Sequence, residues 1–243
     1  MANLSNTFGE REVAPPEREA LVRSVFRRVA DRYDLMNDLM SFGIHRLWKR
    51  SLAWAVDPRP GQLIVDLAGG TGDVARLVMG ADRRVVVIDP SVEMMQAGRG
   101  SSKSLVDWSA GTAESMPLPD ACVDTLTISF GIRNVTDIDT ALAEIWRVLK
   151  PGGRLLCLEF STPAAPLRPF YEAYNRHVIP RLGAMVARHP DAYHYLIESI
   201  RRFPDQEEMK RLLEAQRFTD VYYRNYSFGI ACLHVASRPG NAG

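Results

Sequence analysis

Apolar residues recur at helical spacing near the start of the chain, from Glu17 onward. They fall on one face of a 3.6-residue repeat, and arginines occupy the other face. The apolar face comprises Leu21, Val22, Val25, Phe26, Val29 and Tyr33, and the basic face comprises Arg18, Arg23, Arg27, Arg28 and Arg32. The pattern predicts an amphipathic helix whose arginine face is solvated. The polar residues 1–16 in front of it end in Pro15-Pro16 and predict a flexible lead-in.

After Pro58-Arg59-Pro60-Gly61, short apolar runs alternate with helical segments. Strands are predicted at 62–68, 84–89, 104–108, 123–129, 154–160, 219–225 and 230–237, and helices at 72–79, 91–100, 138–149 and 204–216. The strand at 104–108 has the weakest pattern. Such alternation predicts an α/β, doubly wound, Rossmann-like sheet that binds ligands at the carboxyl ends of its strands. The last two strands, joined by the turn 226–229, predict an antiparallel hairpin.

The stretch 161–203 interrupts this alternation. Its helical, aromatic and basic character predicts a cap inserted over the sheet. At 243 residues, the chain has the length of one full-sized domain plus a modest insertion. We therefore expect a helical segment at 1–60 that belongs to the same domain as residues 61–243.

Three glycines, Gly69, Gly70 and Gly72, directly follow the first predicted strand, and Asp89 ends the second. A tight turn at a helix start, followed by a carboxylate placed to hold a ribose, predicts a nucleoside-containing cofactor. The run Gly70–Ala75 satisfies the dinucleotide pattern G-x-G-x-x-G/A, so an NAD(P)-linked oxidoreductase is one interpretation. Asp66 lies inside the strand just before the glycines. A carboxylate there favours a cofactor with a positively charged end over a pyrophosphate.

The overall composition narrows the classes of function. A formal net charge of +1 argues against a general nucleic-acid binder. The three cysteines are far apart in strand-like contexts, which predicts reduced core thiols, and the histidines show no metal-ligand spacing. No signal peptide and no bilayer-length apolar run is visible, so we expect a cytoplasmic protein.

The glycine turn, Asp66, the leading helix and the run 147–155, which follows a helix and opens a strand, resemble the class I S-adenosylmethionine-dependent methyltransferases. That family has a seven-stranded sheet whose last strand is antiparallel. The resemblance implies S-adenosyl-L-methionine as cofactor, with the glycines near its methionine and ribose, Asp89 on the ribose hydroxyls, and Thr112-Ala113 beside the adenine. The expected cofactor-binding residues are Asp66, Gly69, Gly70, Thr71, Gly72, Asp89, Thr112, Ala113 and Ser129.

Longer stretches resemble one family of methyltransferases, the UbiE/COQ5 quinone C-methyltransferases. They lie at 25–49, 127–135, 153–161, 195–201 and 229–234, and the resemblance extends from about Phe8 to the end of the chain. It implies C-methylation of 2-methoxy-6-polyprenyl-1,4-benzoquinol, of demethylmenaquinol, or of both. The chain departs from the family pattern at Thr112, where Asn or Asp is usual, and in a short segment around the third strand.

Ring carbon is nucleophilic enough for this transfer only in an electron-rich quinol, so a group that stabilises the phenolate or takes its proton accelerates it. Arg133 and Asn134 follow the strand that ends at Ser129 and are the expected catalytic pair. Arginine stays protonated, so Arg133 is expected to stabilise the phenolate or hold a water, and Asn134 to hold the second ring oxygen. His45 is the expected proton acceptor. The alternatives without a catalytic role are a surface loop for Arg133 and Asn134, and a histidine at a helix start that bonds to the backbone for His45.

The isoprenoid tail of such an acceptor needs apolar surface, which the insertion offers beside arginines. These residues are Phe170, Tyr171, Tyr174, Val178, Ile179, Leu182, Met185 and Val186, with Arg168, Arg176, Arg181 and Arg188. A transient contact with the inner membrane surface is one hypothesis, and a flap packed on its own domain is the alternative. The expected partners are the prenylated hydroquinone and other quinone-biosynthesis enzymes. Two further functions stay open: an O- or N-methyltransferase of a soluble aromatic metabolite, and a non-catalytic member of a quinone-biosynthesis complex.

Overall fold

The computed structural model describes residues 7–8, 11–29, 37–38, 41–100, 105–178 and 190–240. Several residues named above lie outside these ranges: Arg32, Tyr33, Ile179, Arg181, Leu182, Met185, Val186 and Arg188.

Within the described ranges, seven strands form one sheet in the order β5-β4-β3-β6-β7-β9-β8. Their bounds are β3 Leu63–Leu67, β4 Arg84–Asp89, β5 Val106–Ala110, β6 Val123–Ser129, β7 Leu149–Phe160, β8 Thr219–Tyr226 and β9 Ala231–Ser237. The pairs from β5 through β7 are parallel, whereas β9 is antiparallel to both β7 and β8. The predicted class, a doubly wound Rossmann-like sheet with its last strand antiparallel, is confirmed.

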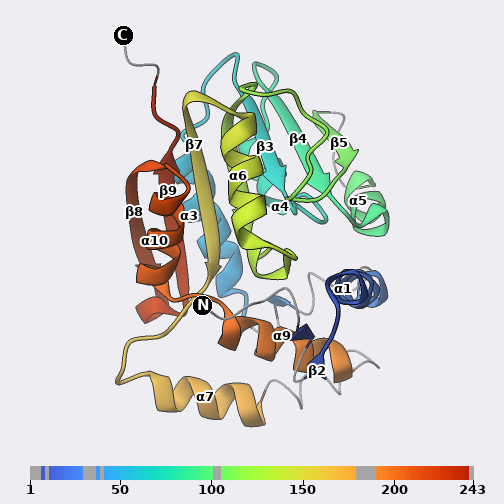
Figure 1. The fold of residues 1–243 in the computed structure, drawn as a ribbon, viewed down its shortest axis with the longest axis vertical. Coiled ribbons are helices and arrows are strands. Elements are labelled where there is room, and N and C mark those ends of the chain that lie inside the picture. Colours follow the sequence, from blue (N-terminus) through green and yellow to red (C-terminus); the bar gives the residue numbers. More distant parts are fainter. Residues whose placement is uncertain are drawn as a thin grey trace.

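Helices cover both faces of this sheet (Figure 1). On one face, α6 (Ile138–Val148) and α10 (Gln206–Ala215) bury apolar side chains against the strands in one hydrophobic core. On the other face, α3 (Ile44–Val56), α4 (Asp73–Val78) and α5 (Val92–Arg99) contribute to a second core. Side chains alternate between the faces of each strand, so β6 sends Leu126 and Ile128 into the first core and Thr127 to the opposite side.

Three further helices lie beyond the carboxyl ends of the parallel strands: α1 (Pro15–Val29), α7 (Arg168–His177) and α9 (Pro190–Arg202) (Figure 1). α1 contacts both α5 and α9. The predicted cap therefore includes α7 and α9, and α1 joins it at the edge where α/β sheets bind ligands. Among the helices within the described ranges, none is long and apolar enough to cross a membrane.

Several predictions of local structure were wrong. The predicted lead-in contains a pair of antiparallel strands, β1 (Thr7–Phe8) and β2 (Arg11–Glu12), and α1 begins at Pro15 rather than at Glu17. Proline suits the first turn of a helix because its φ is fixed and its missing N–H has no partner there. The third strand lies at Val106–Ala110, two residues beyond its predicted range.

The predicted turn at 151–153 lies inside β7 as a bulge. Val123 pairs with Leu149 and Thr125 pairs with Arg154, so the residues between Leu149 and Arg154 loop out while the strand continues on both sides. Gly152 has φ of 78°, which allows the reversal within the bulge.

Candidate cofactor and acceptor site

The chain makes a tight turn between β3 and α4. Ala68, Gly70 and Gly72 have φ of 50°, 55° and 79°, in the left-handed region that favours glycine. A Cβ atom on Gly72 would lie 2.7 Å from Cη2 of Trp108, so a larger residue there displaces the indole. The turn therefore depends on its glycines, and it places backbone N–H groups at the carboxyl edge of the sheet.

Asp89 fixes this turn from the neighbouring strand. Its Oδ2 accepts a hydrogen bond from the Gly70 N–H at 2.8 Å, and its Oδ1 accepts one from the Ser91 N–H at 2.7 Å. The side chain is almost completely buried, and burial raises the pKa of Asp89 to about 6 against the opposing effect of these two donors. Each carboxylate oxygen can accept two hydrogen bonds, so both keep a lone pair for a ligand hydroxyl.

A cavity of about 420 Å³ opens beside this turn, within the range of about 300–1,000 Å³ usual for small-molecule sites. Five of the predicted residues line it: Gly70, Asp89, Thr112, Ala113 and Asn134. They come from β3, β4, β5 and β6, each at or just after the carboxyl end of its strand. The sequence prediction did not include Met94, Glu114, Phe130 and Asp137, which also line the cavity.

Asp66 lies beneath the glycine turn instead of facing the cavity. Its Oδ2 accepts a hydrogen bond from the Ala75 N–H at 3.0 Å, and its Oδ1 accepts one from the Thr127 hydroxyl at 2.9 Å. Burial raises the pKa of Asp66 to about 6. A Cβ on Gly69 would lie 2.8 Å from Asp66 Oδ2. The carboxylate expected to meet the positive end of the cofactor is thus engaged in holding the turn to α4 and β6.

The other predicted cofactor residues shape the turn from outside the cavity lining. Thr71 is buried, and its carbonyl accepts a hydrogen bond from Arg76. Ser129 ends β6 with a buried hydroxyl that has no hydrogen-bond partner among the described residues. The carboxyl edge of the sheet, where the cavity lies, also contains Gly69, Thr71, Gly72 and Ser129. Their neighbours, and not these four residues, line the cavity.

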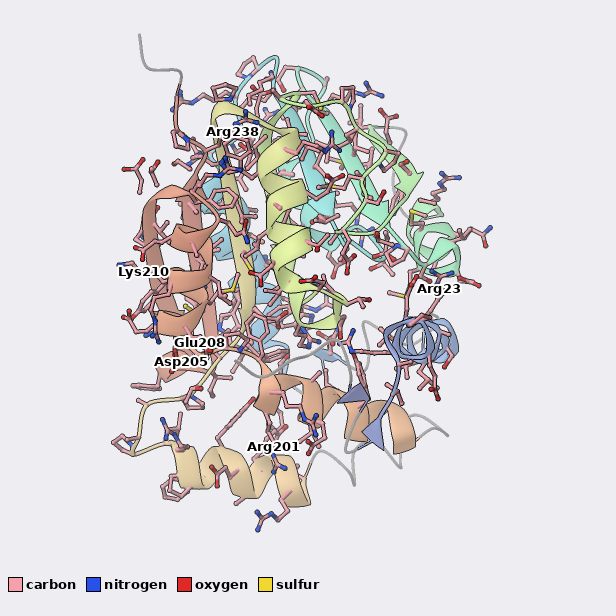
Figure 2. The ribbon with its side chains drawn as sticks, in the orientation of Figure 1. Arg23, Arg201, Asp205, Glu208, Lys210 and Arg238 are labelled. Carbon is pink, nitrogen blue, oxygen red and sulfur yellow. The ribbon has the colours of Figure 1, made fainter. Side chains whose placement is uncertain are left out.

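Helix α1 forms one wall of the cavity through Pro16, Glu19, Val22 and Arg23. Arg23 lies between α1 and α5 in the view of Figure 2, and its guanidinium pairs with the Glu19 carboxylate at 2.6 Å. The sequence pattern predicted the helix and the burial of Val22, but it carried no signal that the helix covers a ligand site.

Arg18 contradicts the prediction of a solvated arginine face. It is 2% exposed and donates hydrogen bonds to the carbonyl oxygens of Arg133 at 3.4 Å, Asn134 at 3.2 Å and Val135 at 2.9 Å. These carbonyls belong to the turn after β6, residues 130–135, which we call the site turn. Arg18 is buried because backbone carbonyls outside regular secondary structure need hydrogen-bond donors, and α1 supplies one through this tertiary contact.

Arg133 is buried within the site turn. Its Nη1 donates to Glu159 Oε1 at 2.7 Å and to the Phe130 carbonyl at 2.6 Å, and its guanidinium lies over the Phe160 ring. Burial raises the pKa of Glu159, and the charge of Arg133 opposes that rise. The cationic group expected to face the acceptor is therefore paired with a buried carboxylate, which the sequence analysis did not single out.

Asn134 presents its side chain to the cavity and to α9. The Tyr195 hydroxyl donates to Asn134 Oδ1 at 2.9 Å, and Tyr195 is itself buried. The amide nitrogen of Asn134 lies 3.5 Å from the Phe130 carbonyl. The site turn is thus held from α1 by Arg18 and from α9 by Tyr195.

His45 lies at the start of α3, outside the cavity lining, and is 3% exposed. The Ser41 hydroxyl donates its one proton to the Asn37 carbonyl at 2.7 Å, so the 2.8 Å contact between Ser41 Oγ and His45 Nδ1 has the ring N–H as donor. Nε2 then carries a lone pair, and it is buried without a hydrogen-bond partner in the described structure. Burial, with Lys49 nearby, lowers the pKa of His45 to about 4, so the ring is neutral near pH 7.

Comparison with known proteins places the chain in a family. The ubiE/COQ5 methyltransferase family matches residues 15–238, which is most of the chain. The chain is similar to ubiquinone/menaquinone biosynthesis C-methyltransferases of Rubrivivax gelatinosus, at 62% identity over 98% of this chain and 95% of the relative, and of Caulobacter vibrioides, at 50% over 96% and 98%. The chain belongs to the ubiE/COQ5 methyltransferase family. It is an S-adenosylmethionine-dependent methyltransferase.

Solved structures with low identity to this family member share its fold. An S-adenosylmethionine-dependent methyltransferase of Thermotoga maritima superposes with a TM-score of 0.65 at 21% identity, covering 89% of this chain and 99% of the other. Haemonchus contortus phosphoethanolamine N-methyltransferase 2, solved in complex with S-adenosyl-L-methionine, gives 0.59 at 15% identity, covering 79% and 52%.

The residues of this ubiE/COQ5 family member fit its cofactor. Gly70 lines the cavity without a side chain, and a Cβ there would lie 3.1 Å from Cε of Met94, which lines the same cavity. The buried Asp89 carboxylate offers acceptors to ribose hydroxyls, and apolar side chains supply most of the remaining wall.

Proposed function

We propose that this chain transfers the methyl group of S-adenosylmethionine to a ring carbon of a polyprenylated quinol: 2-methoxy-6-polyprenyl-1,4-benzoquinol, demethylmenaquinol, or both. Membership of the ubiE/COQ5 family and relatives sharing 48–62% of its residues support C-methylation in ubiquinone/menaquinone biosynthesis. One observation supports assigning the proposal to particular residues: Asp89 and Asn134 line the same cavity.

In this proposal Asp89 holds the ribose hydroxyls, Thr112 and Ala113 flank the adenine, and Gly70 allows close approach of the backbone. The cofactor supplies an electrophilic methyl group on a sulfonium. The protein then has to orient an electron-rich ring carbon in line with that methyl, and such positioning is worth roughly 7–11 kcal/mol in well-oriented reactions.

Asn134 is the group best placed to bind the acceptor. Its Oδ1 accepts a hydrogen bond from Tyr195, and one N–H of its amide points to the Phe130 carbonyl at 3.5 Å. The second N–H is the donor proposed to hold a ring oxygen or a phenolate. Arg133 acts in this proposal by holding the site turn, because its guanidinium is engaged by Glu159 and the Phe130 carbonyl.

His45 is proposed to accept the proton of the quinol hydroxyl. Its ring is neutral, and its Nε2 lone pair is free because Ser41 fixes the proton on Nδ1. One helical turn later, Trp48 packs against Phe130 of the cavity lining with ring centroids 6.2 Å apart. This contact ties the histidine's helix to the acceptor side of the site.

The polyprenyl tail is proposed to reach the site from an anionic membrane surface. Exposed apolar residues gather at the start of α3 and on α7, where the Phe42 and Tyr174 rings lie 5.9 Å apart. We call this the aromatic surface; it comprises Phe42, Ile44, Leu47, Phe170 and Tyr174. α3 has no acidic residue, and Arg50 on α3 and both Arg168 and Arg176 on α7 are exposed, which suits contact with anionic lipid.

A vesicle experiment tests this contact. Co-sedimentation with anionic vesicles should fall for a Phe42→Ser/Phe170→Ser variant and stay unchanged for Trp54→Ser. Trp54 is 86% exposed on α3, but it is ten residues beyond Ile44, where the helix begins, and so roughly 15 Å along the helix axis at a rise of about 1.5 Å per residue. Equal binding by all three proteins, or none by the parent, contradicts the proposed contact.

The reaction is tested by transfer of labelled methyl from S-adenosylmethionine to chemically reduced, short-tailed demethyl-benzoquinol and demethyl-naphthoquinol, with mass spectrometry of the product. Methylation at ring carbon is expected, with little transfer to the untailed rings. Asp89→Ala should abolish transfer, whereas Asp107→Ala, which removes an exposed carboxylate from the adjacent β5, should not. Transfer to oxygen, or equal rates without the tail, favours a methyltransferase of soluble aromatic metabolites.

A further inference from the structure

Arg18 joins two elements that are far apart in sequence. It belongs to the first turn of α1, and the carbonyls it binds belong to residues 133–135 of the site turn. The guanidinium is a planar fork, so one side chain can serve several oxygens whose positions are fixed relative to one another. At 2% exposure, the side chain and its hydrogen bonds are shielded from water.

The neighbours of Arg18 on α1 form a wall of the cofactor cavity. The lining residues from α1 are Pro16, Glu19, Val22 and Arg23, so the position of the helix sets the position of this wall. The site turn lines the same cavity through Phe130, Gly131, Asn134 and Val135. Arg18 therefore ties the wall contributed by α1 to the turn that carries the proposed acceptor-binding amide.

The side chain of Asn134 is held from the other direction. Tyr195 of α9 binds its Oδ1, whereas Arg18 binds its backbone carbonyl. Inside the turn, the Asn134 N–H donates to the Gly131 carbonyl at 3.0 Å, and the Val135 N–H donates to the Ile132 carbonyl at 3.3 Å. The turn is one short helical segment, and Arg18 and Tyr195 hold it from two outside elements.

We propose that Arg18 is a positioning residue for methyl transfer: it couples the placement of α1 over the cofactor cavity to the orientation of the Asn134 amide toward the acceptor. The inference rests on the proposed function. It adds to that function a residue, Arg18, that lies outside both the glycine turn and the Arg133-Asn134 pair. Loss of Arg18 should leave the cofactor residues Gly70 and Asp89 in place but free the site turn, and misplacement of a reacting group by about 1 Å costs on the order of 100-fold in rate.

A double-mutant cycle on kcat tests whether Arg18 acts through Asn134. Arg18→Met should lower kcat on the order of 10–100-fold, with a smaller rise in KM for S-adenosylmethionine. In an Asn134→Ala background the same change should cost less than about 2-fold, because the amide it positions is gone. An equal loss of kcat in both backgrounds overturns the proposal, since a general structural role is additive.

Two matched variants keep the cycle interpretable. Arg18→Lys retains the charge and one or two of the hydrogen bonds, so it should recover part of kcat and serves if Arg18→Met does not fold. Arg23→Met removes an arginine from the same helix and the same cavity wall without touching the site turn. Its effect should fall on KM for S-adenosylmethionine and should be the same in the Asn134→Ala background.

Amide hydrogen exchange with S-adenosylhomocysteine bound tests the inference without any acceptor, so its failure is separate from failure of the proposed reaction. In Arg18→Met, a peptide covering 130–136 should exchange at least about 10-fold faster than in the parent, while β3 and the glycine turn stay protected. In Arg23→Met the 130–136 peptide should exchange as in the parent. Unchanged exchange of 130–136 in Arg18→Met overturns the proposal.

Discussion

The Asp89 carboxylate accepts a hydrogen bond from the Gly70 N–H, with 2.8 Å between Oδ2 and the nitrogen, so the end of β4 fixes the turn that leaves β3. The second oxygen accepts a hydrogen bond from the N–H of Ser91, the residue that caps the start of α5. One side chain thus organises both the glycine turn and the helix beside it. The cofactor is expected to meet a carboxylate whose orientation is fixed before binding.

Asp89→Asn should weaken cofactor binding at least about 10-fold. Both carboxylate oxygens accept from backbone donors, so the asparagine N–H₂ must face one of those N–H groups, at a cost of about 1–3 kcal/mol for an unsatisfied donor. Calorimetric titration with S-adenosylhomocysteine measures the change. Asp107→Asn, on the neighbouring strand with its carboxylate 57% exposed, is the control and should bind as the parent does. Equal affinities contradict the role of Asp89.

Gly98→Ala should destabilise the protein by about 1–3 kcal/mol and weaken cofactor binding. A Cβ at this position on α5 would lie 2.3 Å from the Thr71 carbonyl oxygen and 2.6 Å from Cη2 of Trp108, so α5 and the glycine turn must separate. Gly100→Ala is the control, because among the residues that the structure describes its Cβ would meet only the Ala97 carbonyl, at 3.9 Å. Urea unfolding of both variants measures the difference, and equal midpoints contradict this packing.

The glycine turn and the sheet were predictable because their signals are local. A β-branched run followed by Gly69, Gly70 and Gly72 reports a strand and a turn that needs positive φ, and Asp89 ends the next strand. Gly70 and Asp89 accordingly lie in one cavity lining, as the spacing implied. The alternation of strands and helices indicated the fold class for the same reason.

The partners of the charged residues were not predictable in this way. The sequence pattern around an arginine on a helix face does not show whether the side chain is solvated or buried against distant carbonyls. Arg23 is largely solvated, whereas Arg18 is buried. The pairing of Arg133 with Glu159 joins positions 26 residues apart, one in the site turn and the other on β7. Asp66 looked like a cofactor ligand because its partners, Ala75 and Thr127, are brought to it only by the fold.

Glu159→Gln should destabilise the protein by about 3–5 kcal/mol, because it leaves the buried Arg133 cation without its counter-charge. The Arg133→Met/Glu159→Gln double variant should be less destabilised than Glu159→Gln alone, since it removes the uncompensated charge. Denaturant unfolding of the complete cycle measures both. Glu214→Gln, which breaks an exposed pair with Lys210, should change stability by less than about 1 kcal/mol. A double variant no more stable than Glu159→Gln contradicts the pair's role.

Ser41→Ala should lower kcat without moving the acid limb of the rate profile. The hydroxyl fixes the proton on His45 Nδ1, and its loss lets the ring place a proton on Nε2 instead. Because burial lowers the pKa of His45 to about 4, the ring stays unprotonated as the pH falls toward 5. Activity lost near pH 6 is therefore expected from protonation of Asp89 and Asp66, each with a pKa of about 6, and not from protonation of His45. Rates measured from pH 5 to 9 test this, and a Ser41→Ala kcat equal to the parent's contradicts it.

Asp66→Asn should make the protein more stable than the parent above pH 6. The folded-state pKa of Asp66 is raised from 3.8 to about 6, so folding favours the protonated form. The stability this contributes is fully present below pH 3.8 and is lost as the pH rises through 6, a change of about 3 kcal/mol at roughly 1.4 kcal/mol per pH unit.

An asparagine at position 66 can keep both neighbours satisfied. Its oxygen can accept from the Ala75 N–H, and its N–H₂ can donate to the Thr127 oxygen while that hydroxyl turns to the Val65 carbonyl, 3.4 Å away. The unfolding free energies of parent and variant should thus diverge between pH 4 and 7, with the variant gaining. Parallel curves over that range would mean that Asp66 ionises in the folded protein as it does in water, and that burial beneath the glycine turn carries no electrostatic cost.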